Sequence, residues 1–458
     1  MDQIIALILA AGEGKRMKSK YSKVVHKACG SPIIKWVCSA VKEAGIEDIA
    51  VVIGHHAEQV RECLGEEYDY VYQLQQLGTG HAVMQAEEIL NKREGLVFVL
   101  YGDTPLITGD TISKTINYHK TQRCVATVVT AEVENPSGYG RIVRDSEGHV
   151  RKIVEHRDAS PGVLKIKEIN SGMYCFSIKH LLLALKDLKN NNDQGEYYLT
   201  DTLEILINNG LKVGAYVVDN PDEILGVNDR IQLNQVSEIL RERICTSHMK
   251  EGVTLIDPSN TYINSEVKIG IDTVIYPGVI LEGSTVIGED CIIGPNCRIT
   301  NSKIGNNVQI QNSIVTSSSI GDGANIGPFA YIRPESIIGD NVKVGDFVEV
   351  KKSVIGNKTK VPHHAYIGDA EIGENTNIGC GVITVNYNGK DKNKTIIGNN
   401  AFVGCNVNLI APVKVSDNAY IAAGSTITET VPEYSLAIAR ERQINKENWV
   451  NTKGMKKK

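Results

Sequence analysis

The sequence lacks several features that would mark particular classes of protein. Its net charge is −5, so it has no positive excess of the kind that drives non-specific binding to nucleic acids. No apolar run approaches the ~20 residues of a transmembrane helix. The ten cysteines form no CxxC pair, which argues against a zinc module. No basic segment precedes the apolar stretch 4–11, as a secretory signal would require, so we expect a cytoplasmic protein with free thiols.

The first half of the 458 residues alternates strand-like and helix-like segments. Buried strands are expected at 4–10, 48–54 and 95–103, with a helix over 31–45. This alternation predicts a Rossmann-like, mostly parallel α/β sheet, which binds ligands beyond the carboxyl ends of its strands. A helix over 230–250 is expected to link residues 1–229 to a second domain, 251–458.

The second half is a repeat in which an aliphatic residue returns every six positions, with three slips of register. The first run of this series is Ile263, Ile269, Ile275, Leu281, Ile287, Ile293 and Ile299. The period is that of a short strand plus a corner, and three such units make one coil of a triangular β-solenoid. The pattern resembles the hexapeptide-repeat family of left-handed parallel β-helices, whose members commonly trimerise and transfer acyl groups from coenzyme A.

The repeat also predicts which side chains stack on successive coils, about 4.8 Å apart. If residues 386–394 loop out of one repeat, a single outward column contains Asp346, His363, Cys380, Cys405 and Ala423. The same count places Arg333 directly below Lys351.

These stacked residues admit more than one interpretation. The two like charges of Arg333 and Lys351 fit either a phosphate clamp or a solvated basic edge. His363 is either a surface residue or a catalytic base. A zinc site at His363 and His364 is disfavoured, because adjacent strand residues diverge and no third ligand is evident.

A glycine-rich turn, "LAAGEGKRM" (9–17), leaves the first strand. By itself it fits either a phosphate-binding turn or an ordinary tight connection. A wider set of motifs is more specific: Lys23, "QLGTGHA" (76–82), "YGD" (101–103), "NPSGYGRI" (135–142), "VEH" (154–156), "INSG" (169–172) and "GVND" (226–229). Together they resemble the sugar-nucleotide pyrophosphorylase family.

That resemblance implies a reaction of UTP with a sugar 1-phosphate, which gives a UDP-sugar and pyrophosphate. It implies that Asp103 and Asn228 bind Mg²⁺. The implied substrate-binding residues are Leu9, Ala10, Ala11, Gly12 and Lys23 for the nucleotide, Gln73, Gly78 and Thr79 for uracil, Tyr101, Gly102 and Asp103 at the strand end, and Gly140, Glu155, Asn170 and Asn228 around the sugar and metal. One departure is Ser22, where the family usually has proline before the lysine.

Further motifs in the repeat extend the resemblance over essentially the whole chain. They are "IRPES" (332–336), "VEVKKS" (348–353), "VPHHAYIGDAEIG" (361–373), "NIGCGVITVNYNGKDK" (377–392) and "IARERQ" (438–443). The chain thus resembles the bifunctional N-acetylglucosamine-1-phosphate uridyltransferases and glucosamine-1-phosphate N-acetyltransferases, which make UDP-N-acetylglucosamine for the bacterial cell envelope. The alternative is a pyrophosphorylase whose β-helix is a non-catalytic oligomerisation module.

The resemblance implies a role for each residue of the second site. His363 is the general base, Arg333 and Lys351 bind the sugar phosphate, and Tyr366 and Asn377 hold the sugar. Acetyl-coenzyme A contacts Cys380, Asn386, Tyr387, Cys405, Ala423 and Arg440. Cysteine stands at 380 and 405 where the family usually has alanine and serine, so contact by backbone is expected there.

The chemistry of amine acetylation fits this assignment. An amine must lose a proton before it attacks a thioester, and imidazole, which titrates near ~6.5, is an apt acceptor. Glu349, one coil below, is a candidate to orient the ring of His363. The lysines of 390–394 and of the tail 453–458 either meet coenzyme A phosphates or are solvated.

Overall fold

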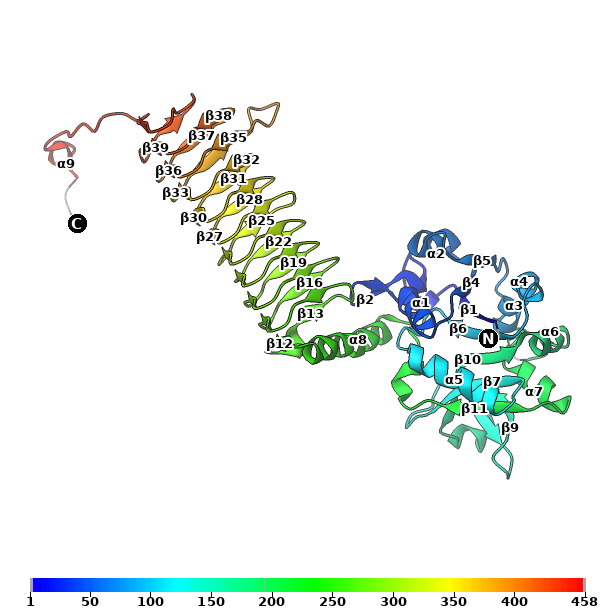
Figure 1. Cartoon of the computed structure of the whole chain (residues 1–458). Helices are drawn as coiled ribbons and strands as arrows, with labels where there is room; N and C mark the ends of the chain where they lie inside the picture. The colour runs from blue at the N-terminus through cyan, green and yellow to red at the C-terminus, as the bar shows by residue number, and fades with distance from the viewer. Residues whose placement is uncertain (1–2, 193, 456–458) are drawn as a thin grey trace. The chain divides into compact units, whose positions relative to one another are not determined.

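The computed structural model describes residues 3–192 and 194–455 and divides the chain into two compact units, Met1–Arg241 and Glu242–Lys458 (Figure 1). We call these unit 1 and unit 2. The boundary falls within helix α8, Arg230–Lys250. Within the described residues, none of the helices combines the length and the apolar character needed to cross a bilayer.

Unit 1 is built on a mixed sheet in the order β11-β7-β10-β6-β1-β4-β5, with β8 and β9 attached at β10. Its central strands β6, β1, β4 and β5 run parallel, and β10 runs antiparallel to β6 and β7. The strands are β1 (Ile4–Ala10), β4 (Asp48–Ile53), β5 (Asp69–Tyr72), β6 (Leu96–Tyr101), β7 (Ala126–Glu132), β8 (Arg141–Arg144), β9 (Val150–Val154), β10 (Glu168–Ser177) and β11 (Val213–Val217), with a separate ribbon of β2 (Lys27–Ala28) and β3 (Ser31–Pro32).

Both faces of this sheet are buried, because alternate residues of β1 enter two different cores. Ala6 and Ile8 pack with α1 and α5, whereas Ile5 and Leu7 pack with α3, α6 and α7. The helices are α1 (Ile33–Glu43), α2 (Ala57–Leu64), α3 (Thr79–Met84), α4 (Glu87–Asn91), α5 (Gly109–Thr121), α6 (Ile178–Lys186) and α7 (Asp201–Asn208), with short 3-10 turns η1 (Lys15–Met17), η2 (Lys23–Val25), η3 (Val163–Lys165) and η4 (Pro221–Ile224). The predicted α/β class is confirmed.

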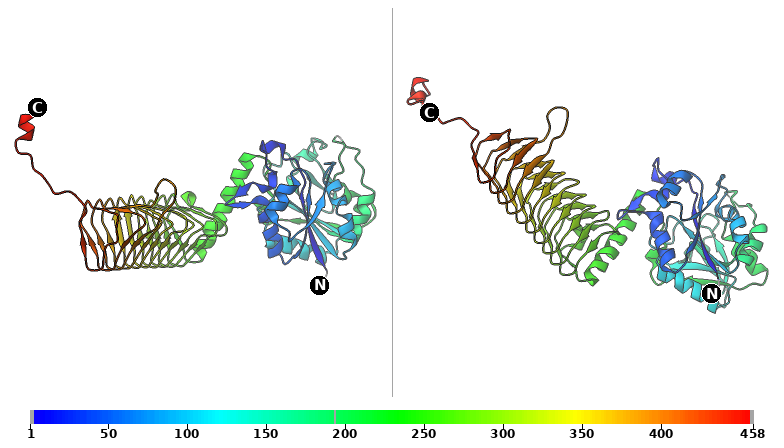
Figure 2. Two further views of the ribbon diagram at one scale, coloured as in Figure 1. Left: turned by 90° about the horizontal axis from the view of Figure 1, so that it is seen from above. Right: turned by 45° about the horizontal axis from the view of Figure 1, so that its top comes forward.

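Unit 2 is a parallel β-helix whose coils stack as successive rungs (Figures 1 and 2). Each strand pairs in parallel with the equivalent strand one coil away, which gives three flat sheets. We name each sheet by its first strand.

The β12 sheet contains β12 (Thr254–Leu255), β15 (Val274–Ile275), β18 (Ile292–Ile293), β21 (Gln309–Ile310), β24 (Asn325–Ile326), β27 (Lys343–Asp346), β30 (Lys360–His363), β33 (Asn377–Ile378), β36 (Phe402–Val403), β39 (Tyr420–Ile421) and β41 (Leu436–Ala437). The β13 sheet contains β13 (Tyr262–Ile263), β16 (Ile280–Glu282), β19 (Arg298–Thr300), β22 (Ile314–Thr316), β25 (Tyr331–Ile332), β28 (Glu349–Lys351), β31 (Tyr366–Gly368), β34 (Ile383–Val385), β37 (Asn408–Ile410) and β40 (Thr426–Ile427). The β14 sheet contains β14 (Lys268–Ile269), β17 (Val286–Ile287), β20 (Lys303–Ile304), β23 (Ser319–Ile320), β26 (Ile337–Ile338), β29 (Val354–Ile355), β32 (Ala370–Ile372), β35 (Thr395–Ile397) and β38 (Val413–Val415). Outside these sheets lie η5 (Pro258–Asn260) and α9 (Trp449–Thr452).

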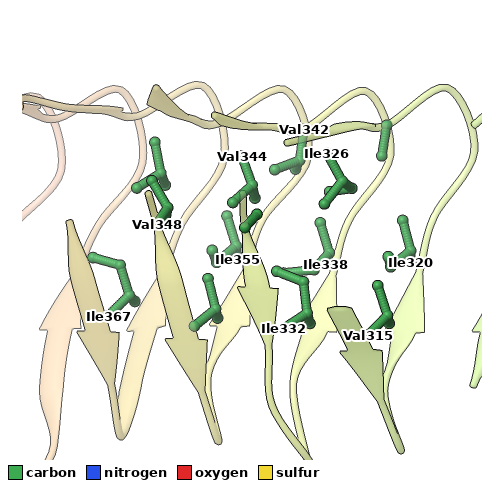
Figure 3. Close-up of a cluster of buried hydrophobic side chains, with 14 of the residues drawn as sticks. Val315, Ile320, Ile326, Ile332, Ile338, Val342, Val344, Val348, Ile355 and Ile367 are labelled. Carbon is green, nitrogen blue, oxygen red and sulfur yellow. The ribbon is translucent and has the colours of Figure 1, made fainter. Parts of the chain in front are cut away.

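The aliphatic residues that recur every six positions in the sequence are the side chains that point into the β-helix. Figure 3 shows Ile326, Ile332, Ile338 and Val344 pointing into the interior from successive strands, where they are almost wholly buried. Each such side chain contributes roughly 1.5–3 kcal/mol through removal from water. The predicted left-handed β-helix of hexapeptide repeats is confirmed.

Left-handed backbone turns the chain at many corners, as at Asn341, with a φ of 55°. Asparagine and glycine tolerate this conformation better than other residues. Between β34 and β35, a longer loop leaves the coils and returns to them, and it is visible as a protrusion in Figure 2. The looping-out inferred for 386–394 is therefore observed.

Candidate functional site

Each unit has a candidate site, and that of unit 1 is a cavity of about 350 Å³ at the carboxyl ends of β1 and β6. These neighbouring strands pair in register, with Leu9 opposite Tyr101, so the glycine-rich turn and the "YGD" segment meet at one sheet edge. The lining residues are Leu9, Ala10, Ala11, Gly12, Lys23, Val24, Gln73, Gln76, Gly78, Thr79, Ala82, Tyr101, Asp103 and Glu196.

The cavity brings together all eight residues predicted to bind the nucleotide and uracil. It also has four lining residues to which no role was assigned: Val24, Gln76, Ala82 and Glu196. Gln76 and Ala82 belong to the "QLGTGHA" motif, whereas Val24 and Glu196 lie outside the quoted motifs. Glu196 belongs to a loop far along the chain, and neighbouring Tyr197 holds it there by accepting a 2.7 Å hydrogen bond from the Gly80 amide. Five predicted substrate residues lie outside the lining: Gly102, Gly140, Glu155, Asn170 and Asn228.

Lys23 joins the two predicted metal ligands. Its ammonium forms an ion pair with Asp103, and both side chains are only 17% exposed. The Asn228 side-chain oxygen accepts hydrogen bonds from Lys23, at 3.3 Å, and from Arg16, at 2.8 Å. Two hard oxygen ligands thus converge on a point that a cation already occupies, which fits Mg²⁺. Within the described residues, no cluster of three or more His, Cys, Asp or Glu side chains offers a complete protein cage for a metal.

The three predicted sugar-binding residues lie close together. The Gly140 carbonyl accepts a 2.9 Å hydrogen bond from the Asn170 amide. A Cβ at Gly140 would lie 3.4 Å from both carboxylate oxygens of Glu155. Burial, together with the negative charges of Asp158 and Asp201, raises the pKa of Glu155.

Ser22, which stands where the family usually has proline, makes a hydrogen bond that proline could not make. Ser22 is buried, at 2% exposure, and its amide donates a 2.7 Å hydrogen bond to Gln59 Oε1. Its φ of −53° is one that proline adopts, but proline has no amide hydrogen for this bond. The hydroxyl of Ser22 is buried without a partner.

The candidate site of unit 2 includes the predicted column. Asp346 and His363 are paired in register on β27 and β30, and His363 Nδ1 lies 2.5 Å from Asp346 Oδ1. The backbone ladder continues upward: the Gly381 amide donates to the His364 carbonyl at 2.9 Å, and the Asn406 amide donates to the Cys380 carbonyl at 2.7 Å. The stacking order of Asp346, His363, Cys380 and Cys405 is therefore observed.

The partner of the His363 ring differs from the prediction. Glu349 does not orient the ring, because its carboxylate accepts a 2.6 Å hydrogen bond from Arg333 Nη1. Asp346 is the partner instead, and the hydrogen bond from His363 lowers the pKa of Asp346. The adjacent His364 ring stacks on Phe347 with centroids 4.9 Å apart, so the two histidines have different surroundings.

Arg333 and Lys351 stack on consecutive coils, and each has a carboxylate partner. Arg333 pairs with Glu349, and Lys351 lies 3.0 Å from Asp369, with 16% and 14% of these last two side chains exposed. Burial opposes ionisation of Asp369, but hydrogen bonds from Lys351 and Asn386 lower its pKa.

Lys392, on the protruding loop, also lies beside Lys351, whose charge lowers the pKa of Lys392. The sequence left the lysines of this loop open, and their position depends on how the loop folds back. Of the tail, Lys456–Lys458 lie outside the described residues.

The other predicted residues of this site fall on two sheets. Tyr366 lies on β31, and its hydroxyl accepts a 3.4 Å hydrogen bond from Asn386. Asn377 lies on β33 of the β12 sheet, whereas the strand of Tyr366 belongs to the β13 sheet. Within one chain, the two residues therefore lie on different faces of the β-helix. Tyr387 is exposed on the protruding loop, and Arg440 lies near Ala423, 3.8 Å from the position of a Cβ at Gly424.

Comparisons with known proteins match both units. The "Nucleotidyl transferase" family model matches residues 5–221. The "Bacterial transferase hexapeptide (six repeats)" model matches 260–301 and 394–429, and the "GMPPB C-terminal domain" model matches 314–409.

Curated relatives cover nearly the full chain. "Bifunctional protein GlmU" of Acetivibrio thermocellus is 63% identical over 99% of each chain. The proteins of the same name from Caldanaerobacter subterraneus and Clostridium novyi are 60% and 56% identical, over 98% and 99% of each chain. The chain belongs to the GlmU family. GlmU membership, with a nucleotidyltransferase unit and a hexapeptide unit, confirms the predicted enzyme: a bifunctional transferase that makes UDP-N-acetylglucosamine by acetyl and uridylyl transfer, with a nucleotide and acetyl-coenzyme A as substrates.

Proposed function

We propose that the two reactions are divided between the units. Residues 1–229 transfer the uridylyl group, residues 251–458 transfer the acetyl group, and 230–250 link them. The cavity at the ends of β1 and β6 supports the first assignment. The observation that carries the second is the 2.5 Å contact between His363 Nδ1 and Asp346 Oδ1 on the outer edge of the β-helix.

For uridylyl transfer, the nucleotide occupies the cavity, with Gln73, Gly78 and Thr79 at the uracil. The sugar lies against Gly140, Glu155 and Asn170. The attacking sugar phosphate is already an anion, so no protein base is needed, and the barrier is charge repulsion around the α-phosphate. Lys23 would exchange its present carboxylate partner for phosphate oxygens.

We assign the metal to Asp103 and Asn228, whose oxygens both face Lys23. Mg²⁺ bound there would offset the charge repulsion between the reacting phosphates. Tyr101 and Gly102 shape the strand end from which Asp103 projects.

For acetyl transfer, the hydrogen bond to Asp346 decides which nitrogen of His363 acts. Nδ1 holds a proton and donates it to the ionised carboxylate, which leaves Nε2 free to accept a proton from the amine of glucosamine 1-phosphate. The neutral amine then attacks the thioester carbonyl. As the carbonyl reforms, coenzyme A leaves as a thiolate, and it takes up the proton that the attacking nitrogen gives up. Asp346 is thus a positioning residue for the base.

The phosphate of the acceptor lies at Arg333 and Lys351, and the position of Lys392 beside Lys351 supports a third contact from this lysine. The β31 strand runs from the corner that carries His363 toward Lys351, which pairs with Gly368, and Tyr366 is the first residue of this strand. A sugar phosphate placed along this strand would direct its phosphate to one end and its amine to the other. Acetyl-coenzyme A lies along Cys380, Asn386, Tyr387, Cys405, Ala423 and Arg440.

We further propose that the enzyme is a homotrimer in the cytoplasm. Asn377 and Tyr366 project from different sheets, so a site that uses both takes one of them from a neighbouring copy. The free thiols of Cys380 and Cys405 suit a reducing compartment. Sedimentation equilibrium measures the predicted mass of three chains, and a monomer would refute the shared site.

His363→Ala tests the acetyl-transfer assignment. A general base is worth roughly 10²–10⁴ in rate, so release of coenzyme A from acetyl-coenzyme A and glucosamine 1-phosphate should fall by that factor. His364→Ala is the matched control and should keep the activity. If His363→Ala keeps it too, the assignment is wrong, and a pyrophosphorylase with a non-catalytic, oligomerising β-helix becomes the better description.

A further inference from the structure

Two cysteines, one exposed and one half-buried, occupy equivalent positions on consecutive coils of the β-helix. Cys380 and Cys405 each directly precede a left-handed corner residue, Gly381 with a φ of 74° and Asn406 with a φ of 54°. Strands β33 and β36 pair with Asn377 opposite Phe402, which places Cys380 opposite Cys405. The 2.7 Å hydrogen bond from the Asn406 amide to the Cys380 carbonyl links the two corners directly.

This spacing is compatible with a covalent link between the two residues. Neighbouring strands lie about 4.8 Å apart, and bridged cysteines have Cα atoms roughly 4.4–6.8 Å apart. The two coils also approach each other closely beside the pair, because a Cβ at Gly379 would lie only 2.6 Å from the Cys405 amide nitrogen. The backbone therefore holds both thiols in fixed register.

The two thiols differ from the buried cysteines in their access to solvent. Cys405 is exposed and Cys380 is half-buried. By contrast, burial raises the pKa of Cys38 to about 12 and that of Cys297 to about 11, which keeps these thiols protonated and inert.

The position of Cys380 and Cys405 on the β-helix indicates which small molecule can react with their thiols. Cys380 stands one coil above His363, Ala423 lies beyond Cys405 in the same column, and Arg440 lies close to Gly424, the residue after Ala423. These residues are among those that we assigned to acetyl-coenzyme A, a set that we call the acetyl-coenzyme A groove, so the ligand that reaches these thiols is one that carries a coenzyme A moiety.

We propose that Cys380 and Cys405 form a thiol–disulfide exchange site for coenzyme A disulfide, at which the oxidised form of the enzyme's own product blocks acetyl transfer. The proposal rests on the assigned acetyl-coenzyme A groove. The nucleotide and pantetheine parts of the disulfide bind as those of the thioester do, and the disulfide takes the place of the thioester group.

The exchange takes place in two balanced steps. Cys405 loses its proton, and its sulfur attacks one sulfur of the disulfide; the S–S bond breaks, and one coenzyme A leaves as a thiolate that takes up a proton. Cys380 then attacks the Cys405 sulfur, the second coenzyme A leaves in the same way, and a Cys380–Cys405 disulfide forms. Two protein thiols are oxidised, and one coenzyme A disulfide is reduced to two coenzyme A thiols.

The test exposes the reduced full-length protein to coenzyme A disulfide and follows its intact mass and peptide map. We expect loss of two hydrogens from the native protein, mapped to Cys380 and Cys405. Cys380→Ala should stop at the first step and retain one coenzyme A on Cys405. Cys405→Ser should take up none. Cys63→Ala, which removes a half-buried thiol of unit 1, is the control and should react like the native protein.

Activity supplies the second readout. Acetyl transfer should fall in proportion to the oxidised fraction and return with dithiothreitol, while pyrophosphate release from UTP and N-acetylglucosamine 1-phosphate stays constant. Glutathione disulfide, which lacks the nucleotide, should react much more slowly; an equal rate would refute groove-directed exchange. Absence of modification at Cys405 would refute the proposal outright. If the untreated, reduced protein already lacks acetyl transfer, it is instead the assigned acetyltransferase site that fails.

Discussion

At the scale of single residues, the chemistry of unit 2 depends on which carboxylate faces His363. Two acids lie one coil below the ring, and they have different partners: Asp346 accepts from His363, and Glu349 accepts from Arg333. Under the proposed assignment, Asp346 fixes the tautomer of the base, and Glu349 balances the charge of a cation proposed to bind the phosphate.

Asp346→Asn tests the proposal that Asp346 positions the ring of His363. An amide in place of the carboxylate no longer selects the Nδ1–H tautomer, so kcat for acetyl transfer should fall roughly ten- to a hundredfold, less than the loss caused by removing the base. KM for glucosamine 1-phosphate should stay near the native value, because the phosphate contacts are elsewhere. Steady-state kinetics measures both, and a change confined to KM would contradict the positioning role.

Asp201 supplies a pH-dependent prediction for unit 1. It opens helix α7, but burial and the charges of Glu204 and Asp158 raise its pKa to about 6 from an ordinary 3.8. The folded state therefore holds this proton more tightly than the unfolded state, so stability is lost as pH rises between about 4 and 6. Asp201→Asn should be on the order of 2 kcal/mol more stable than the native protein at neutral pH, a value reduced for solvent screening because Asp201 is only half-buried, and equal to it below about pH 4.

Urea unfolding followed by helical circular dichroism measures the difference, because most of the helix lies in unit 1. The exposed Asp187 provides the control, and Asp187→Asn should leave the free energy of unfolding within about 0.5 kcal/mol of the native value. A stability gain for Asp201→Asn that is the same at both pH values would contradict the titration.

At the scale of elements, the β-helix strands alternate sharply between inside and outside. Ile338 on β26 is 2% exposed, while its neighbour Ile337 is 52% exposed. This alternation supplies a matched pair of substitutions with the same side chain and the same strand.

Ile338→Ala should cost about 2–5 kcal/mol, because it removes buried methyl groups and leaves a cavity between coils. Ile337→Ala should cost no more than about 0.5 kcal/mol, as is usual for exposed positions. Chemical unfolding of both variants measures the difference. Equal losses would show that Ile337 is buried in the assembled enzyme.

The sequence predicted the elements of unit 2 well because its period is local. The inward aliphatic residues repeat every six positions, so simple counting placed Asp346, His363, Cys380 and Cys405 in one column. Counting cannot choose between Asp346 and Glu349 as the partner of His363, because side-chain torsions decide that. The sequence also could not predict that Lys392 lies beside Lys351, because a loop that leaves the repeat has no periodic pattern to count.

In unit 1, the motifs predicted most residues of the cavity, but they did not predict a lining residue from a distant loop. Glu196 reaches the cavity only because the segment around Tyr197 packs against Gly78 and Gly80. That contact depends on tertiary packing and has no local signal in the sequence.

At the scale of the whole molecule, the chain consists of two units that each have their own core and their own candidate site. Damage to one site is therefore expected to leave the other reaction intact. The two reactions are connected through a small product, N-acetylglucosamine 1-phosphate.

Complementation between two inactive variants tests this independence. Asp103→Ala should lose pyrophosphate release and keep acetyl transfer, whereas His363→Ala should do the reverse. A mixture of the two should make UDP-N-acetylglucosamine from glucosamine 1-phosphate, because the intermediate diffuses from one protein to the other. Failure of the mixture, with each remaining activity intact, would show that the intermediate must pass between units of one molecule.

The loop between β34 and β35 adds residues to the chain without moving the neighbouring coils apart. Coils on either side of it pair without interruption, Thr384 opposite Leu409, although the step is longer than elsewhere in the repeat. Extra residues enter at a corner and exit at the same corner, so insertion there leaves the catalytic edge in place. Changes to the length or sequence of this segment are therefore expected to alter the loop and its contacts without disturbing the coils that hold His363, the proposed base.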